Sequence, residues 1–232
     1  MTAHYTAFFY GTLMHPKILK RVIKNEGAHL EICPAVLLDH TRHRVKGCEY
    51  PGVVPYEKGR QLFPDRELGQ EERSVRGTLV RGLTMPDIGH LDVFEGDEYE
   101  RLPVSLRPLE PFAPLNSPAG RPDGPESLIP QHVAPLPPLD KLPDAVEAQT
   151  YIFLDLRHLE SKLWSWDEFI ENSAWKWYGG SPEDDTPSDS SPASETLHAG
   201  SCRSRGREEK SCDACCHRKR VGWGLKSIEE DV

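Results

Sequence analysis

Proline is distributed very unevenly along this 232-residue chain. Of its 21 prolines, 12 lie between Pro103 and Pro143. Proline lacks a backbone N–H and favours extended conformations, so this stretch is predicted to be a surface insertion, about residues 107–147, with no packed element. Residues 179–232 are rich in Ser, Asp and Pro and poor in large apolar side chains, which predicts a disordered tail. The sequence therefore predicts one domain, residues 1–178, whose folded part of roughly 137 residues has an ordinary domain size.

The charge balance argues against a nucleic-acid-binding protein. The chain has 28 basic and 37 acidic residues, a formal charge of −9, whereas phosphate binding needs a basic surface. It has no apolar run of the ~18 residues that a membrane span requires, and no basic, apolar leader at its start. We expect a soluble, cytoplasmic protein without membrane contact. Two cysteines lie in the first half and four in the last 31 residues; this layout predicts reduced thiols rather than a disulfide framework.

The folded part alternates between short β-favouring segments and two helical segments. A strand from Tyr5 to Tyr10 is followed by a glycine turn and a helix that begins at Pro16, and a second helix is expected from Pro86 to Phe94. The sequence predicts an α+β fold. Further strands are expected at residues 31–38, 43–45, 52–56, 74–80, 101–106 and 149–154.

A third helix is expected near the end of the domain. One stripe at helical spacing contains Leu159, Leu163, Trp166, Ile170 and Trp177, and a Gly-Gly pair at 179–180 follows it. Four of the five tryptophans lie between residues 164 and 177. Large aromatic residues at this spacing indicate a packed core more often than a cofactor site.

A glycine turn follows the first predicted strand. It contains six consecutive residues: Tyr10, Gly11, Thr12, Leu13, Met14 and His15. Such a turn presents consecutive backbone N–H groups and can hold a carboxylate or phosphate without a charged side chain. An ordinary strand-to-helix connection has the same pattern, so the turn alone leaves both interpretations open.

An acidic segment follows the second predicted helix. It contains Glu95 directly after Phe94, with further carboxylates before and after it. An apolar neighbour that desolvates a carboxylate can raise its pKa, as a general base working near neutral pH requires. The alternative is a solvated acidic loop.

Five motifs in this order resemble the gamma-glutamylcyclotransferase superfamily, and most closely its avirulence-induced-type (AIG2-like) branch. They are FFYGTLMHPKIL, YPGVVP, VRGTLVRGL, LDVFEGDEYERLPV and AQTYIFL. The resemblance implies a compact mixed β-barrel flanked by helices, and a reaction without a cofactor. The α-amino group of a gamma-glutamyl compound attacks its own γ-carbonyl, which gives 5-oxoproline and a free amine.

The resemblance also implies roles for particular residues. The catalytic glutamate of the family falls on Glu95, as general base, and the substrate-holding turn falls on Tyr10 to His15. Tyr99 and Arg101 either line the same cleft or pack and pair at the start of a strand. No residue is expected to bind a metal. Two rival functions remain: a small-molecule-binding module on this fold, and an interaction protein that binds a partner through the Pro-rich insertion or the tail.

The tail contains a short cysteine cluster at Cys212, Cys215 and Cys216. Its C-x-x-C pattern followed by basic residues resembles the start of a fungal binuclear zinc cluster. No cysteine follows Cys216 in this sequence, so we expect no complete cluster of this kind, and a single zinc ion would need ligands that are nearly contiguous.

Overall fold

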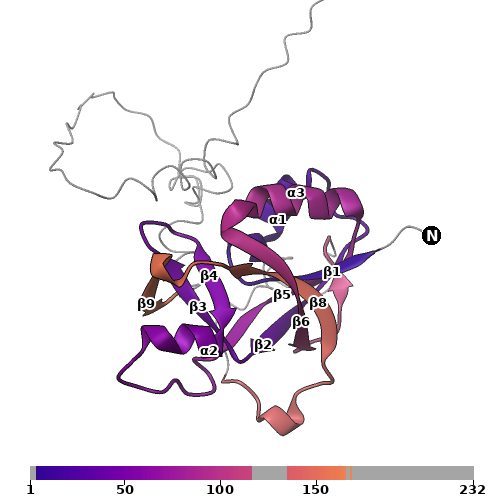
Figure 1. The fold of residues 1–232 in the computed structure, drawn as a ribbon. Coiled ribbons are helices and arrows are strands. Elements are labelled where there is room, and N and C mark those ends of the chain that lie inside the picture. The colour runs from indigo at the N-terminus through magenta and orange to yellow at the C-terminus, as the bar shows by residue number, and fades with distance from the viewer. Residues whose placement is uncertain (1–3, 117–134, 166–167, 169–232) are drawn as a thin grey trace, which may run out of the picture.

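A closed β-barrel forms the centre of the protein (Figure 1). The computed structural model describes residues 4–116, 135–165 and 168. Five strands close the barrel in the order β5-β1-β8-β6-β2, and β2 pairs again with β5. β1 runs parallel to β8, and the other neighbouring pairs are antiparallel. The barrel strands are β1 (Tyr5–Phe9), β2 (Glu31–Leu38), β5 (Ser74–Leu83), β6 (Tyr99–Pro108) and β8 (Val146–Phe153).

A second, three-stranded sheet and several helices surround the barrel (Figure 1). The sheet has the order β4-β3-β9, and the short strand β7 pairs with β2 at the edge of the barrel. These elements are β3 (His40–Val45), β4 (Pro51–Pro55), β7 (Ala113–Pro114), β9 (Leu159–Leu163), α1 (Pro16–Ile23), α2 (Tyr56–Gly59) and α3 (Met85–Glu95). Single 3-10 turns are η1 (Thr12–Met14), η2 (Arg60–Leu62), η3 (Gly96–Glu98), η5 (Leu139–Lys141) and η6 (Leu156–His158). The fold is therefore α+β with a barrel, as the family resemblance implies.

The barrel strands alternate between two buried clusters. In β2, Cys33, Ala35 and Leu37 belong to the cluster formed by all five barrel strands, whereas Ile32 belongs to the cluster that contains α1 and α3. Successive strand side chains point to opposite faces. One face therefore fills the barrel, and the other packs against the helices and the second sheet.

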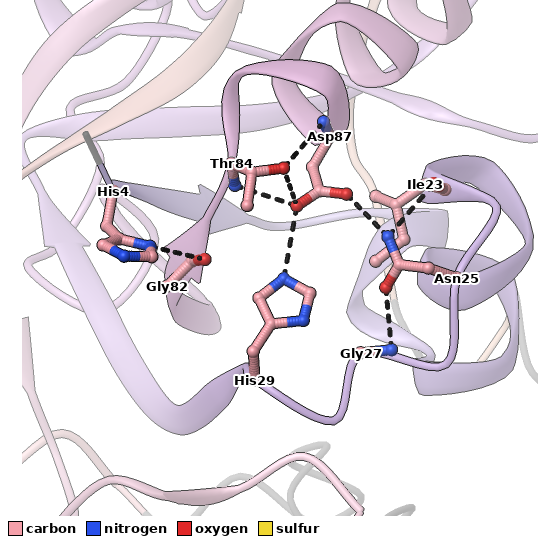
Figure 2. A network of polar contacts seen from close by, with 8 residues as sticks. All are labelled: His4, Ile23, Asn25, Gly27, His29, Gly82, Thr84 and Asp87. Carbon is pink, nitrogen blue, oxygen red and sulfur yellow. Dashed lines mark hydrogen bonds and ion pairs between the residues drawn. The ribbon is translucent and has the colours of Figure 1, made fainter. Parts of the chain in front are cut away.

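The N-terminus of α3 is fixed by a buried carboxylate (Figure 2). Asp87 is only 2% exposed and accepts hydrogen bonds from the Thr84 backbone N–H (2.8 Å) and from its hydroxyl (2.7 Å). It also accepts one from the amide of Asn25 (2.7 Å), directly after α1, and lies 3.4 Å from His29. Thr84 and Asp87 form a capping box. The network therefore joins α3 to the end of α1.

The structure corrects the bounds of two segments predicted from the sequence, the third helix and the Pro-rich insertion. Residues 159–163 form strand β9, not the start of a helix, because Leu159 and Leu163 pair with Val45 and His43 of β3. Positions four apart share a face in a strand as well as in a helix, so the stripe did not distinguish them. The rest of the predicted helix, with Trp166, Ile170 and Trp177, lies outside the described residues.

The Pro-rich insertion is also shorter than expected. β6 continues through Pro103 to Pro108, β7 contains Pro114, and β8 begins at Val146. β6 pairs with β2 only at Arg107 and Pro108, so the outer edge of β6 has no partner strand at Pro103, and an edge tolerates proline. Residues 117–134 and the predicted tail, residues 179–232, lie outside the described part of the chain.

The two described cysteines differ in their bonding state. Cys33 is a free, buried thiol inside the barrel, as predicted. Cys48 is in a disulfide, so the prediction of reduced thiols is wrong for that residue. The four C-terminal cysteines, including the cluster at Cys212, Cys215 and Cys216, lie outside the described residues. No helix of the described chain is long and apolar enough to cross a membrane.

Candidate functional site

A small cavity lies where β1 ends and α3 ends. Its volume is about 20 Å³, which is room for one or two water-sized groups. The walls come from four separate parts of the chain: the end of β1 with the segment after it, the start of β4 with the residue before it, the end of α3 with the start of β6, and β8. The lining residues are Phe8, Phe9, Tyr10, Gly11, Thr12, Leu13, Tyr50, Pro51, Glu95, Tyr99 and Tyr151.

The turn after β1 packs tightly against β4. A Cβ added to Gly11 would lie 2.9 Å from the Cγ of Pro51, so only glycine fits between the turn and this proline. The turn then forms η1, in which Met14 N–H donates to the carbonyl of Gly11 (2.9 Å). The backbone N–H groups of Gly11, Thr12 and Leu13 have no acceptor among the described residues. They are therefore available to an anionic group at the cavity.

Glu95 is the last residue of α3 and is half-buried. Gly96 follows it with a φ of 70°, a left-handed conformation that glycine adopts without strain, and the chain turns there through η3 into β6. Phe94 packs against the core that contains α1 and α3. Among the described residues that line the cavity, Glu95 alone has a carboxylate.

The four tyrosines that line the cavity all donate their hydroxyl protons to the protein. The pairs are Tyr10 with the carbonyl of Tyr151, Tyr99 with the carbonyl of Pro51 (2.8 Å), Tyr50 with the carboxylate of Glu98 (3.1 Å), and Tyr151 with the carboxylate of Asp92 (2.8 Å). Carbonyl and carboxylate oxygens can only accept. The phenol is therefore the donor in every pair.

Three of these phenols are also held in their protonated form. Burial, and then the negative charge of Glu95, raise the pKa of Tyr10, although the Val53 backbone and Arg42 act in the opposite direction. Burial likewise raises the pKa of Tyr99 and of Tyr151, and Glu95 adds to the shift in both. Neutral phenols cannot act as bases near neutral pH. Glu95 is thus the group at the cavity that can accept a proton.

The structure brings together most of the residues expected at the site. Tyr10, Gly11, Thr12, Leu13, Glu95 and Tyr99 line one cavity. Met14, His15 and Arg101 are not among its lining residues in the described chain.

Each of these three residues has another position. Met14 is buried in the core, and the His15 side chain accepts a hydrogen bond from the Lys17 N–H at the start of α1. Arg101 pairs with Asp92, with its Nε 2.9 Å from Oδ1. Of the two alternatives for Tyr99 and Arg101, Tyr99 lines the cleft and Arg101 forms an ion pair at the start of β6.

Sequence reasoning assigned no role to Tyr50, Pro51 or Tyr151. All three lie in motifs that carried the resemblance, YPGVVP and AQTYIFL. A tyrosine in a hydrophobic strand has the pattern of a core residue, so only the three-dimensional arrangement shows that Tyr151 reaches the cavity. In the described residues there is no group of three or more His, Cys, Asp or Glu side chains that could hold a metal ion.

A larger hollow of about 450 Å³ lies along α2 and the loop after it. Its walls include Tyr56, Arg60, Phe63 and Arg66. None of the residues expected at the site lines it, and several of its side chains are exposed and charged. The smaller cavity is therefore the candidate site.

Comparison with known proteins supports the resemblance found in the motifs. Residues 7–113 match the family described as gamma-glutamyl cyclotransferase, AIG2-like. AIG2-like protein A of Arabidopsis thaliana is 31% identical over 102 residues, which cover 44% of this chain and 52% of that protein. AIG2-like protein C of the same plant is 30% identical over 104 residues, or 45% of this chain and 51% of that protein. The match thus spans about half the length of these relatives.

Solved structures give a weaker likeness. The crystal structure of a yeast gamma-glutamyl cyclotransferase specific to glutathione covers 75% of this chain and 77% of its own, with a TM-score of 0.43 and 13% identity. A TM-score this low carries no argument. The predicted family is confirmed by the family match over residues 7–113.

Proposed function

Because residues 7–113 belong to the gamma-glutamyl cyclotransferase, AIG2-like family, we propose that this protein is a cofactor-independent gamma-glutamyl cyclotransferase. The α-amine of a gamma-glutamyl compound attacks its own γ-carbonyl, which gives 5-oxoproline and a free amine. The observation that carries the proposal is the position of Glu95. Glu95 lines one cavity together with the turn at Gly11 to Leu13 and with the neutral phenols of Tyr10, Tyr99 and Tyr151.

Glu95 is the general base in this proposal. The substrate amine is an ammonium near neutral pH and must lose a proton before it can attack. Glu95 takes that proton, and the free amine then attacks the γ-carbonyl; the ring nitrogen loses a second proton as the C–N bond forms. The bond from the γ-carbon to the leaving nitrogen breaks, and both protons pass by way of Glu95 to that nitrogen, which leaves as an ammonium, so the reaction consumes no acid or base overall.

The turn at Gly11 to Leu13 holds the α-carboxylate of the substrate. Its three backbone N–H groups lack acceptors in the described protein, and a carboxylate can accept several such bonds at once. With the carboxylate fixed there and the amine at Glu95, the glutamyl chain is held in a folded conformation. Ring closure is intramolecular, so this conformation supplies much of the rate.

The test is the formation of 5-oxoproline from a panel of gamma-glutamyl compounds, which includes glutathione, a gamma-glutamyl amino acid and gamma-glutamyl-lysine. Once a substrate is found, Glu95→Gln should lower kcat by a factor of about 10²–10⁴. Glu100→Gln is the matched control, because this nearby carboxylate is exposed and does not line the cavity. Equal activity of Glu95→Gln and wild type would rule out Glu95 as the base. Binding of gamma-glutamyl compounds without 5-oxoproline would instead support a non-catalytic binding module.

A further inference from the structure

A short proline-rich segment on the surface is held at both ends by the fold. Residues 135–138 have the sequence Pro-Leu-Pro-Pro and come directly before the single turn η5. Figure 1 shows them, in the salmon colour of that part of the bar, in a loop that projects from the barrel at the end opposite α1 and α3. None of these four residues lines the candidate site, so the proposed reaction does not account for them.

The backbone of this segment is extended. Proline fixes its own φ at about −65° and restricts the residue before it to extended conformations. Leu136 and Pro137 are each followed by a proline, so both are confined in this way. Pro138 has a φ of −48° and a ψ of 138°, close to the values of a polyproline II helix, which has three residues per turn. Pro135 and Pro138 therefore lie on one edge of the segment, and both are exposed.

A carboxylate fixes the start of the segment. The Leu136 N–H donates to Oε2 of Glu71 (3.0 Å), and Oε1 of Glu71 lies 2.9 Å from Nη2 of Arg76 in β5. The Arg76 side chain is only 11% exposed, so the barrel holds the carboxylate in place. The other three residues are prolines, which have no N–H. The segment therefore has one backbone donor, and that donor is used by the fold.

The chain after the segment is fixed as well. The Lys141 N–H donates to the carbonyl of Pro138 (2.8 Å), Leu142 is buried, and Nη1 of Arg107 in β6 donates to the carbonyl of Pro143 (2.7 Å). A flexible peptide loses conformational freedom when it binds, and a segment that is already held in one conformation avoids much of that cost. The fold therefore presents residues 135–138 in a pre-organised form.

The exposed surface of the segment combines apolar side chains with hydrogen-bond acceptors. Pro135, Pro137, Pro138 and Leu139 are exposed, Leu139 by 45%. The carbonyls of Pro135, Leu136 and Pro137 accept no hydrogen bond from the residues that the structure describes. A complementary surface has flat apolar faces for the proline rings and N–H or O–H donors for the carbonyls. Trp and Tyr side chains supply both.

We propose that residues 135–139 are a docking site for a partner protein with an aromatic-lined groove of the SH3 or WW type. Such grooves bind Pro-x-x-Pro segments in the polyproline II conformation, and Pro135 and Pro138 have this spacing. The proline rings pack against the aromatic rings of the groove, and Trp N–H or Tyr O–H groups of the partner donate to the carbonyls. The proposal does not depend on the proposed function, because the segment does not line the cavity.

The experiment measures binding of the full chain to a panel of purified SH3 and WW domains by isothermal titration. We expect at least one domain to bind, and the double variant Pro135→Ala/Pro138→Ala to bind it at least about tenfold more weakly. Pro64→Ala is the matched control, because Pro64 is an exposed proline in a different loop, and it should bind like wild type.

Two results would overturn the proposal: no binding by any domain of the panel, or equal binding by the double variant and wild type. A concentration-dependent dimer that the double variant abolishes, seen by analytical ultracentrifugation, would also contradict it, because the segment would then dock on a second copy of this chain.

The contribution of the fold is tested with a synthetic peptide of residues 133–141. The full chain should bind the same domain about three- to tenfold more tightly than the peptide does. Glu71→Ala should remove most of this advantage, because the Leu136 N–H loses its acceptor, whereas Glu71→Gln keeps an oxygen at that position and should retain it. Equal affinity of the peptide and the full chain would refute the pre-organisation of the segment by the fold.

Discussion

Replacing Asp87 by alanine should destabilise the protein strongly, because this buried carboxylate connects the start of α3 to the end of α1. Its carboxylate oxygens accept hydrogen bonds from the N–H and the hydroxyl of Thr84 and from the side-chain amide of Asn25, at 2.7–2.8 Å. His29, at 3.4 Å and half exposed, contributes little. The substitution removes all of these contacts at once and leaves the donors without an acceptor.

The magnitude follows from the three close donors. A hydrogen bond to a charged acceptor contributes about 1.5 kcal/mol or more, but the two Thr84 donors share one carboxylate oxygen, Oδ2, so their contributions do not add fully. We expect Asp87→Ala to lower the free energy of unfolding by about 3 kcal/mol. For a domain of this size that corresponds to a fall in Tm of about 6–12 °C.

The pH dependence provides an independent test. Burial alone would raise the pKa of Asp87, but the hydrogen bonds from Thr84, Asn25 and His29 lower it overall. Because the pKa is lower in the folded state, the carboxylate stabilises the fold above its unfolded pKa of about 4. That contribution disappears as the pH falls through the lowered value. The difference in Tm between wild type and Asp87→Ala should therefore be constant near neutral pH and shrink below about pH 4.

Thermal unfolding followed by circular dichroism from pH 3 to pH 7.5 measures both effects. Asp97→Ala is the control, since this acidic residue just after α3 is exposed and should change Tm by less than about 2 °C. A fall in Tm for Asp87→Ala no larger than that of the control would refute the argument from the network. A large fall that does not change with pH would show that packing, and not the charge, is responsible.

Three further predictions concern single positions in the barrel and in α3. Gly77→Ala should prevent stable folding, seen as loss of a cooperative urea transition, because the new Cβ would lie 2.2 Å from the backbone oxygen of Phe9. Gly89→Ala in α3 should instead raise stability in urea by about 0.5–1 kcal/mol, because nothing lies within 4 Å of its Cβ; a loss would show that the helix face is constrained. Burial raises the pKa of the Cys33 thiol to about 11; the positive charge of Arg81 lowers this pKa, and the negative charge of Glu110 raises it. Iodoacetamide at pH 8 should therefore leave Cys33 unmodified in the native protein and alkylate it in urea, which peptide mass spectrometry can measure.

Local patterns were sufficient where neighbouring residues decide the structure. β2 has the predicted bounds, Glu31–Leu38, and α3 differs from the predicted helix by one residue at each end. The prediction of a helix at Leu159 failed for a physical reason. Residues i and i+4 share a face in a helix and in a strand alike, and the pairing with β3 selects the strand. That pairing joins residues more than 100 positions apart, so nothing near Leu159 in the sequence reveals it.

The candidate site likewise contains residues that local motifs indicate and residues whose position depends on distant pairing. Glu95 and the turn after β1 lie in short motifs that drew attention to them, and both line the cavity. The position of Tyr151 at the cavity could not be predicted, because it depends on strand pairing: Tyr151 pairs with Arg101 across β8 and β6, and Arg101 binds Asp92, which accepts the Tyr151 proton. The bond from Asn25 to Asp87 likewise could not be predicted, because it depends on how α1 and α3 pack.

The two carboxylates of α3 are used in opposite ways. Asp87 lies in the first turn, where the positive end of the helix dipole favours an anion, and hydrogen bonds surround it. Glu95 lies at the last position, where the negative end of the helix dipole disfavours an anion. Glu95→Gln should accordingly keep or raise Tm while it removes activity, whereas Asp87→Ala lowers Tm.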